Sequence, residues 1–190
     1  MRVVIVSGGF DPIHSGHIHH FKEAKKLGDI LIVGLNSDEW LTRKKGKPFM
    51  PIEERLAVIK ELRMVDSAVP FNDDDNSSIS LIRNTLVLFD DVVFANGGDR
   101  TAKNIPEIDA FDKDPRVQFV FGVGGSKRNS SSAILEKWTN THTERPWGYY
   151  KVLHNEMNIV KVKELVVMPG KKLSMQRHEN RSEHWFISKG

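Results

Sequence analysis

Hydrophobic residues along the first 138 positions fall into short runs, separated by longer stretches in which apolar side chains recur at helical spacing. Short runs that are apolar throughout are typical of strands buried on both faces, as in parallel sheets with crossover helices. The expected strands span 3–6, 30–35, 65–69, 91–95 and 117–121, and the expected helices span 17–27, 52–62, 78–83 and 131–138. The pattern therefore predicts an α/β fold with a doubly wound, parallel, five-stranded sheet.

The pattern changes after residue 138. The next ten positions are polar and rich in turn formers, including Pro146 and Gly148, which predicts a linker. Apolar runs at 149–153, 159–167 and 185–187, without a helical pattern, predict strands in a small all-β appendage. The expected organisation is a Rossmann-like domain over 1–138, a linker over 139–148 and a β-rich segment over 149–190.

Composition and charge exclude several kinds of partner. The net charge of the 190 residues is +3, with 28 basic and 25 acidic side chains interspersed, so no basic stripe indicates nucleic acid or an anionic membrane. No run approaches the roughly 18 apolar residues that a membrane span requires. The absence of cysteine excludes disulfides and thiolate chemistry and is typical of a reducing compartment, so we expect a cytoplasmic protein.

The strongest local signal follows the first expected strand, where Ser7, Gly8 and Gly9 lead into the segment that opens the first helix. Glycines allow the backbone to approach a phosphate closely, and a helix N-terminus offers unpaired N–H groups and the positive end of its dipole. Ligands of doubly wound sheets bind beyond the carboxyl ends of the strands. The sequence therefore predicts an anion site here.

His14 and His17 flank Gly16 in this segment, and the missing side chain leaves room for phosphate oxygens between two imidazoles. Nucleotidyl transfer depends mainly on positioning and on donors aimed at the charge that develops on phosphate oxygens, a task that imidazoles suit. Two alternatives are solvent-facing rings and a metal site that adds His19 and His20. No carboxylate at ligand spacing accompanies these histidines, which disfavours the metal.

The segment Gly9-Phe10-Asp11-Pro12-Ile13-His14-Ser15-Gly16-His17 resembles the HxGH signature of the cytidylyltransferase-like nucleotidyltransferases. The resemblance covers essentially all of residues 1–138. Within the family it is strongest to the adenylyltransferase domain that acts on heptose 1-phosphate, followed by glycerol-3-phosphate cytidylyltransferase. It continues in family order through 28–29, 36–38, 44–46, Pro51, 54–55, 65–66, 97–99 and 130–132.

The resemblance implies transfer of a nucleoside monophosphate from ATP or CTP to a phosphorylated sugar or polyol, with Mg²⁺ on the nucleotide and pyrophosphate as the second product. It implies that His14, His17 and Lys45, on the loop after the second strand, are catalytic, and that Lys44 can substitute for its neighbour. The implied nucleotide and phosphate contacts are Gly8, Gly9, Phe10, Asp11, Lys44, Gly97, Asp99, Ser130, Ser131 and Ser132.

The implied acceptor contacts are Asp11, Asp38 and Arg55. Each of these assignments has a simpler alternative. Arg55 suits a solvated helix face, Asp11 a helix end, and Asp38 a turn cap or a brace for the lysine loop. The glycines at 97–98 suit an ordinary turn, and the serines at 130–132 suit a helix cap without any ligand.

One departure from the family leaves the base open. Where the cytidylyltransferases carry an arginine followed by a threonine before the terminal hydroxyl cluster, residues 124–129 read Gly-Gly-Ser-Lys-Arg-Asn, and the triple serine also resembles pantetheine-phosphate adenylyltransferase. Both ATP and CTP remain possible donors. The main alternative function is a non-catalytic nucleotide-binding module with a regulatory or scaffolding role.

From Glu144 onward the chain resembles the beginning of the cupin region of type II phosphomannose isomerases. The resemblance implies metal ligands at Gln176, His178 and Glu183, on a barrel of which only the first half is present. Unpaired strand edges invite pairing with a second copy, so we expect a homodimer. A residual strand pair without metal and a metal-dependent sugar-phosphate isomerase are the alternatives for this segment.

Overall fold

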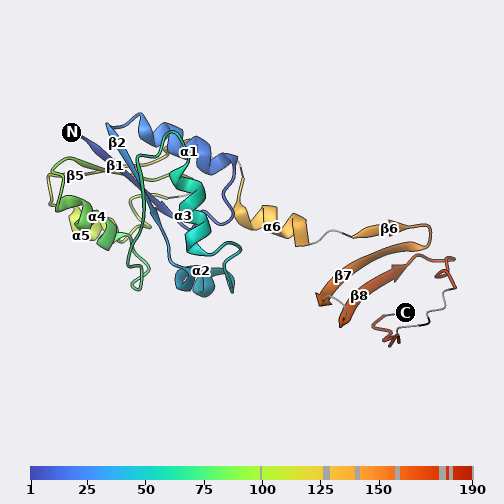
Figure 1. Ribbon diagram of the computed structural model, residues 1–190. Helices are drawn as coiled ribbons and strands as arrows, with labels where there is room; N and C mark the ends of the chain where they lie inside the picture. Colours follow the sequence, from blue (N-terminus) through green and yellow to red (C-terminus); the bar gives the residue numbers. More distant parts are fainter. Residues whose placement is uncertain are drawn as a thin grey trace. The chain divides into compact units, whose positions relative to one another are not determined.

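The computed structural model describes residues 1–98, 100–125, 129–139, 142–156, 159–175, 179 and 182–189. These residues form two compact units, the first over residues 1–135 and the second over residues 136–190 (Figure 1). Asp99, Gln176 and His178, which the sequence assigns to ligands, lie outside the described residues.

The first unit is built on a parallel sheet of five strands with the spatial order β3-β2-β1-β4-β5. The central strand, β1, pairs with β2 on one side and with β4 on the other, so the strand order reverses beside β1. The predicted five-stranded parallel sheet is confirmed. Its strands are β1 (Val3–Gly8), β2 (Ile30–Leu35), β3 (Ser67–Pro70), β4 (Val92–Ala95) and β5 (Val117–Val120).

Helices connect the strands and cover both faces of the sheet. The four predicted helices are present with ends shifted by a few residues, whereas α2 and α5 were not predicted. The helices are α1 (Ser15–Lys25), α2 (Asp38–Lys45), α3 (Ile52–Lys60), α4 (Ile79–Leu86), α5 (Glu107–Phe111) and α6 (Ser131–Thr139). A loop was expected from the sequence where α2 lies.

The core consists of two apolar layers, one on each face of the sheet. Val4 and Val6 of β1 pack with Phe21 of α1 and Ile59 of α3. The alternate residue Ile5 packs with α4 and α5 on the opposite face (Figure 1). Because both faces of each inner strand are buried, the strands read as continuous apolar runs, which is why they were visible in the sequence.

Gly34 of β2 permits an unusually close approach of α4. A Cβ at this position would lie 2.2 Å from Cδ2 of Leu81 and 3.1 Å from Cδ1 of Phe71. The missing side chain therefore lets α4 pack directly against the strand. Since α4 begins only two residues before Leu81, this contact also helps to set where its N-terminus lies.

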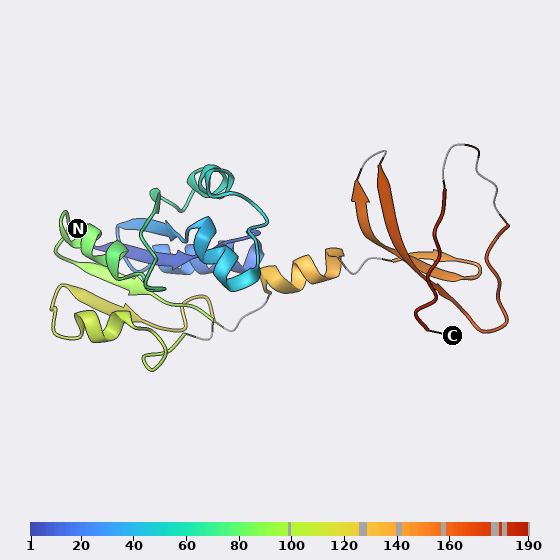
Figure 2. The ribbon, with the colours of Figure 1, turned by 90° about the horizontal axis from the view of Figure 1, so that it is seen from below.

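The second unit is an antiparallel sheet with the order β6-β7-β8, shown with its long β7 and β8 ribbons in Figure 2. β7 (Gly148–Glu156) and β8 (Val160–Val167) match two predicted strands, and β6 (Thr143–Arg145) falls within the stretch expected to be a linker. The strand predicted at 185–187 is wrong. These residues pair with no described strand and are 59%, 91% and 90% exposed, so the apolar run is not sheltered by a ladder.

Among the described parts of the chain, every helix is too short or too polar to cross a membrane.

Candidate active site

A cavity of about 380 Å³ lies at the carboxyl ends of the strands of the first unit and is called the cleft below. Its size is in the range of small-molecule sites. It brings together most of the residues that the sequence assigned to phosphate and nucleotide. Those among its lining are Gly8, Gly9, Phe10, His14, His17, Lys44, Lys45, Gly97, Ser130, Ser131 and Ser132.

The two histidines stack on each other at the start of α1, with ring centroids 3.7 Å apart and an interplanar angle of 21°. His14 is the N-cap of the helix, and its Nδ1 accepts a hydrogen bond of 3.1 Å from the backbone N–H of Gly16. A Cβ on Gly16 would lie 2.9 Å from Cε1 of His14, so glycine is required for this geometry. The first turn of α1 contains no acidic residue, which keeps its positive dipole end available.

His17 is held in an apolar setting that keeps its ring uncharged. Burial, followed by the nearby His14, His20 and Lys45, lowers the pKa of His17 from 6.5 to about 3. Its ring meets Phe10 edge to face at 5.1 Å, and its buried Nδ1 has no hydrogen-bond partner among the described residues. Buried polar atoms without a partner are rare in proteins, so this one marks His17 as a candidate functional residue.

The positive charge near the histidines comes from the last turn of α2. Nζ of Lys45 donates to the backbone oxygen of Asp11 at 2.9 Å, and Nζ of Lys44 lies 4.3 Å from the ring centroid of Trp40. Partial burial is the main cause that lowers the pKa of Lys45, and Asp11 opposes it. The placement of Lys45 on a loop is therefore wrong, because the residue ends a helix whose C-terminal dipole favours cations.

The opposite end of α2 is fixed by a buried carboxylate from another part of the chain. The Ser37 hydroxyl caps the helix by accepting from the N–H of Trp40 at 3.0 Å. Asp73 accepts from both the backbone N–H and the hydroxyl of Ser37, at 2.8 and 2.7 Å, and its backbone oxygen accepts from Arg43. The helix that carries both lysines is thus anchored at its start and in its middle.

Arg55 does not line the cleft, so the structure contradicts a direct acceptor contact by this residue. It is 1% exposed, and its guanidinium donates to the backbone oxygens of Gly9, Asn36 and Met50 and to the Asp38 carboxylate. A guanidinium buried this way satisfies itself on the protein's own acceptors. Arg55 ties the glycine loop to the ends of β2 and α3.

Asp11 and Asp38 belong to the same internal network and also lie outside the cleft lining. The Asp11 carboxylate accepts from the backbone N–H groups of Phe49 and Met50 at 2.7 and 2.8 Å. Asp38 accepts from the N–H of Ile52 and from Arg55, which braces the segment between α2 and α3. The two carboxylates thus shape the site through the backbone and do not face an acceptor in this structure.

The serine cluster joins the start of α6 to the loop after β1. Ser130 caps α6 by accepting from the N–H of Ala133 at 3.1 Å, which confirms the capping interpretation. The Ser131 hydroxyl donates to the backbone oxygen of Pro12 at 2.8 Å. This contact places a second helix N-terminus beside the histidines.

Sequence reasoning weighed His20 only as a possible metal ligand, and the structure gives it a packing role in the cleft. Its Nδ1 lies 2.9 Å from the backbone oxygen of Val123, and burial is the main cause that lowers its pKa. A Cβ on Gly97 would lie 2.8 Å from that ring nitrogen. The spacing of three residues from His17 places both rings on one helix face and is the signal that would have found it.

Trp40, Ser7, Ser77, Ser78 and Glu107 also line the cleft and were not singled out as ligands from the sequence. Glu107 and Ser78 lie on elements that had no recognisable motif. Their approach to the cleft depends on how α4 and α5 pack on the sheet.

No group of three or more His, Cys, Asp or Glu side chains able to hold a metal ion occurs among the described residues. Near the phosphate end of the cleft the polar side chains are imidazole and ammonium groups, and the neighbouring carboxylates of Asp11 and Asp73 accept from backbone N–H groups. Of the ligands expected in the tail, only Glu183 is described, and it is exposed.

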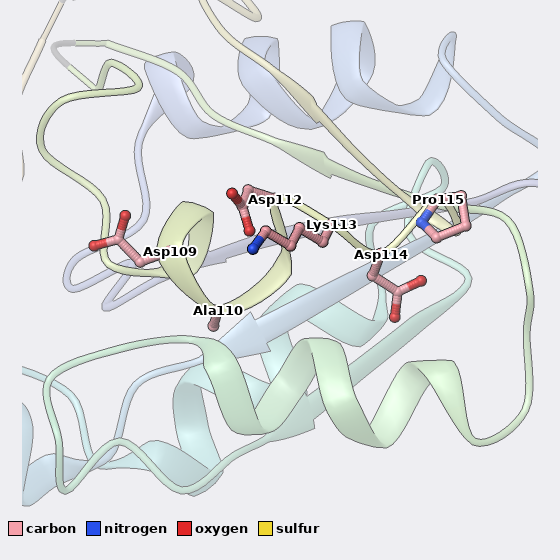
Figure 3. A pocket seen from close by; sticks show the side chains of 6 residues that line it. All are labelled: Asp109, Ala110, Asp112, Lys113, Asp114 and Pro115. Carbon is pink, nitrogen blue, oxygen red and sulfur yellow. The ribbon is translucent and has the colours of Figure 1, made fainter.

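A second depression, of about 620 Å³, is formed by the short segment of Asp109 to Pro115 (Figure 3). It contains none of the residues that resemble the family motifs, and Asp114 in it is paired with Arg116. It is a surface depression made by one short segment, and it is not a candidate for the functional site.

A doubly wound sheet, with two stacked histidines and a lysine near a helix N-terminus beyond its first strand, defines an α/β protein with an HxGH site. Residues 5–109 match the model of the family described as cytidylyltransferase-like. The chain belongs to this family, which confirms the predicted resemblance. Residues 134–190 match a second model, described as mannose-6-phosphate isomerase C-terminal, in agreement with the cupin resemblance of the tail.

Curated relatives include the Bifunctional protein HldE of Wolinella succinogenes, 34% identical over 138 residues, which span 72% of this chain and 27% of that protein. The protein of the same name from Helicobacter pylori strain J99 is 34% identical over 145 residues, or 75% of this chain and 29% of that protein. The chain thus spans little more than a quarter of the length of these relatives.

Solved structures agree on the first unit. A lipopolysaccharide core biosynthesis protein from Thermoplasma volcanium is 32% identical, with a TM-score of 0.52 over 68% of this chain and 99% of that one. A bifunctional NMN adenylyltransferase/ADP ribose pyrophosphatase from Francisella tularensis, complexed with AMP and a manganese ion, has a TM-score of 0.50 over 73% of this chain and 42% of that one. It is 13% identical, so it shows the shared fold alone.

Proposed function

We propose that the first unit transfers a nucleoside monophosphate from a nucleoside triphosphate to a phosphorylated sugar or polyol and releases pyrophosphate. The observation that carries this proposal is the stacked pair of His14 and His17 beside Lys45, at a helix N-terminus free of acidic residues. This set of donors suits an α-phosphate on which negative charge develops.

In the proposed reaction an oxygen of the acceptor phosphate attacks the α-phosphorus in line. The new P–O bond forms as the bond to the β-phosphate oxygen breaks, and pyrophosphate leaves with that oxygen. The neutral ring of His17 contributes a hydrogen bond without a fixed charge, and Lys45 contributes the charge. No covalent intermediate with the protein is required.

Lys45 donates to a neutral backbone oxygen in this structure, so a triphosphate offers its ammonium group a stronger, charged partner. Mg²⁺ is proposed to arrive with the nucleotide, bound by phosphate oxygens and water, and it would neutralise the leaving pyrophosphate. Most ligands of the Mg²⁺ ion would then come from the nucleotide and from water, and few from the protein.

The proposal of a phosphorylated sugar as acceptor rests on the relatives. The first unit resembles the adenylyltransferase domain that acts on heptose 1-phosphate, and one similar structure is a lipopolysaccharide core biosynthesis protein. The same relatives favour ATP as the donor nucleotide. CTP stays in the test because base recognition is expected to rest on backbone groups and on the variable loop before Ser130.

The test is pyrophosphate release with ATP and with CTP, each with Mg²⁺ and with heptose 1-phosphate, glucose 1-phosphate or glycerol 3-phosphate as acceptor. His17→Asn is expected to lower kcat by about a hundredfold or more, because it removes a transition-state donor. His154→Asn, an exposed histidine of the second unit, is the matched control and should retain full activity. Nucleotide binding without release for any pair would instead indicate the binding-module alternative.

For the second unit we propose association with another copy of the chain through β8, which is an edge strand of its sheet and carries exposed Val160 and Val162. Val162→Asp should shift the mass measured by light scattering from dimer to monomer. Val152→Asp changes an equally apolar residue of the central strand β7 and is the control. A monomeric wild-type chain would refute this proposal.

A further inference from the structure

Three cleft residues that the proposed transfer does not use are joined where α4 begins. The backbone N–H of Ser78 donates to Oε1 of Glu107 at 2.6 Å, and the Ser78 hydroxyl donates to Oγ of Ser7 at 2.7 Å. All three residues line the cleft. They come from the end of β1, the N-cap of α4 and the first residue of α5, so the fold has assembled them from distant parts of the chain.

Glu107 is a buried carboxylate with one oxygen still available. The residue is 4% exposed, and its Oε1 accepts from the backbone N–H of Ser78. Oε2 accepts no hydrogen bond from the described residues, and it is not among the side-chain atoms that are closed off from solvent without a partner. Because Glu107 lines the cleft, a hydrogen-bond donor of a bound molecule can reach this oxygen.

Ser7 offers a hydrogen-bond donor, whereas Glu107 offers an acceptor. The oxygen of Ser7 accepts from Ser78, and its own O–H has no acceptor among the described residues. One open acceptor and one open donor therefore lie on either side of Ser78. A hydroxyl group, which both donates and accepts, matches this arrangement, whereas a phosphate oxygen or an ammonium group matches only one half of it.

The end of the cleft near Glu107 differs in charge from the end near His14 and His17, where the phosphates are proposed to bind. The positive end of α4 is already matched by the Glu107 carboxylate, which repels a further anion. The start of α1, by contrast, has no acid in its first turn and faces Lys45. The cleft thus has a cationic end at α1 and an end at α4 that suits an uncharged polar group.

We propose that Glu107 and Ser7 bind a hydroxyl group of a substrate, with that hydroxyl donating to Oε2 of Glu107 and accepting from the Ser7 hydroxyl. The hydroxyl belongs either to the sugar or polyol acceptor or to the ribose of the nucleotide, since both present the same chemistry. This inference rests on the proposed function in one respect, namely that a nucleotide and a phosphorylated sugar or polyol bind in the cleft.

Glu107→Gln is the decisive variant. The glutamine oxygen can still accept from the Ser78 N–H and preserve the helix cap, while the group at the open position becomes an NH₂ donor. Ser7→Ala removes the donor half and gives a second, independent variant. Asp109→Asn, an exposed carboxylate on the same helix α5, is the matched control.

The readout is equilibrium binding by calorimetry to the full chain, which requires no turnover. One arm compares ATP with 2′-deoxyATP and 3′-deoxyATP. The other arm compares glucose 1-phosphate with 2-deoxyglucose 1-phosphate, and glycerol 3-phosphate with 1,3-propanediol phosphate. Wild type is expected to prefer the hydroxylated member of at least one pair by about tenfold, and Glu107→Gln should abolish that preference while Asp109→Asn keeps it.

The arm in which the preference disappears identifies which substrate supplies the hydroxyl. Equal preferences in wild type, Glu107→Gln and Ser7→Ala for every pair, or no preference in wild type, would overturn the inference and leave Glu107 as a cap of α4. If the wild type releases no pyrophosphate, the proposed transfer is refuted. The hydroxyl preference measured by calorimetry would still stand, because it requires no turnover.

Discussion

At the scale of single residues, the side chains of the site fall into two groups that the sequence does not distinguish. His14, His17 and Lys45 reach the cleft, whereas Asp11, Asp38 and Arg55 act on the backbone beneath it. Charged residues near a phosphate motif are therefore not all phosphate ligands. The difference lies in burial, since Arg55 is sealed from solvent by the acceptors of its own chain.

The neutral state of His17 makes stability depend on pH. Its pKa is lowered from 6.5 to about 3, so between these values the unfolded chain binds a proton that the folded chain does not. The free energy of unfolding should therefore fall as the pH decreases from about 6.5 towards 3, by at most about 1.4 kcal/mol per pH unit from this group.

Urea unfolding at pH 7.5, 6.0 and 5.0 measures this effect. His17→Asn should show a shallower dependence than wild type. It should keep part of the dependence because the pKa of His20 is lowered in the same direction. His154→Asn should behave as wild type, and parallel curves for all three proteins would show that His17 titrates normally in the folded state.

Arg55 provides a second prediction at this scale. Arg55→Met should lower the free energy of unfolding by about 3 kcal/mol, because it leaves the Asp38 carboxylate and three backbone oxygens without their donor. Arg55→Lys should recover only part of this, since one ammonium group cannot span the acceptors of a planar guanidinium. Chemical denaturation is the measurement, and Arg63→Lys on the exposed surface is the control. A loss below about 1 kcal/mol for Arg55→Met would contradict a structural role.

At the scale of elements, the position of α2 links a cap to the charge in the cleft. Ser37→Ala removes the N-cap of this helix and one hydrogen bond to Asp73 and should destabilise the protein by about 1 kcal/mol. Because Lys44 and Lys45 end the same helix, the affinity for ATP should also fall severalfold.

Calorimetric ATP binding and urea unfolding check both effects together. Thr42→Ala removes a hydroxyl from the interior of the same helix without touching its cap and should leave ATP affinity unchanged. Unaltered ATP binding by Ser37→Ala would mean that the lysines hold their positions without the cap.

The elements also show what the sequence was able to predict. The strand at 30–35 was predicted residue for residue, because a strand buried on both faces is apolar throughout. Helix α2 was missed because Trp40 and Leu41 are its only large apolar residues, and its stability comes from contacts such as Ser37 with Asp73, 36 residues away. The paired histidines were found since their motif is local, whereas Glu107 reaches the cleft only through tertiary packing.

At the scale of the whole molecule, every described residue that lines the cleft lies between Ser7 and Ser132. A chain that ends at Thr139, after α6, should therefore bind ATP with an affinity within about twofold of the full chain, since no contact of the cleft is removed. Calorimetry on the two proteins checks this. A large loss of affinity in the shortened chain would show that residues 140–190 support the site.

Gly34, the second-to-last residue of β2, affects the shape of the cleft without lining it. Gly34 is buried under α4 and does not itself line the cleft, although it pairs with the cleft residue Ser7 of β1. The absence of a side chain there allows α4, with its N-cap Ser78, to pack close to the sheet. A side chain at this position would overlap the side chains of Leu81 and Phe71. If α4 moves to relieve this overlap, it carries Ser78 away from Ser7 and Glu107. In related chains, a larger residue at position 34 together with a smaller one at position 81 would thus change substrate preference through the core.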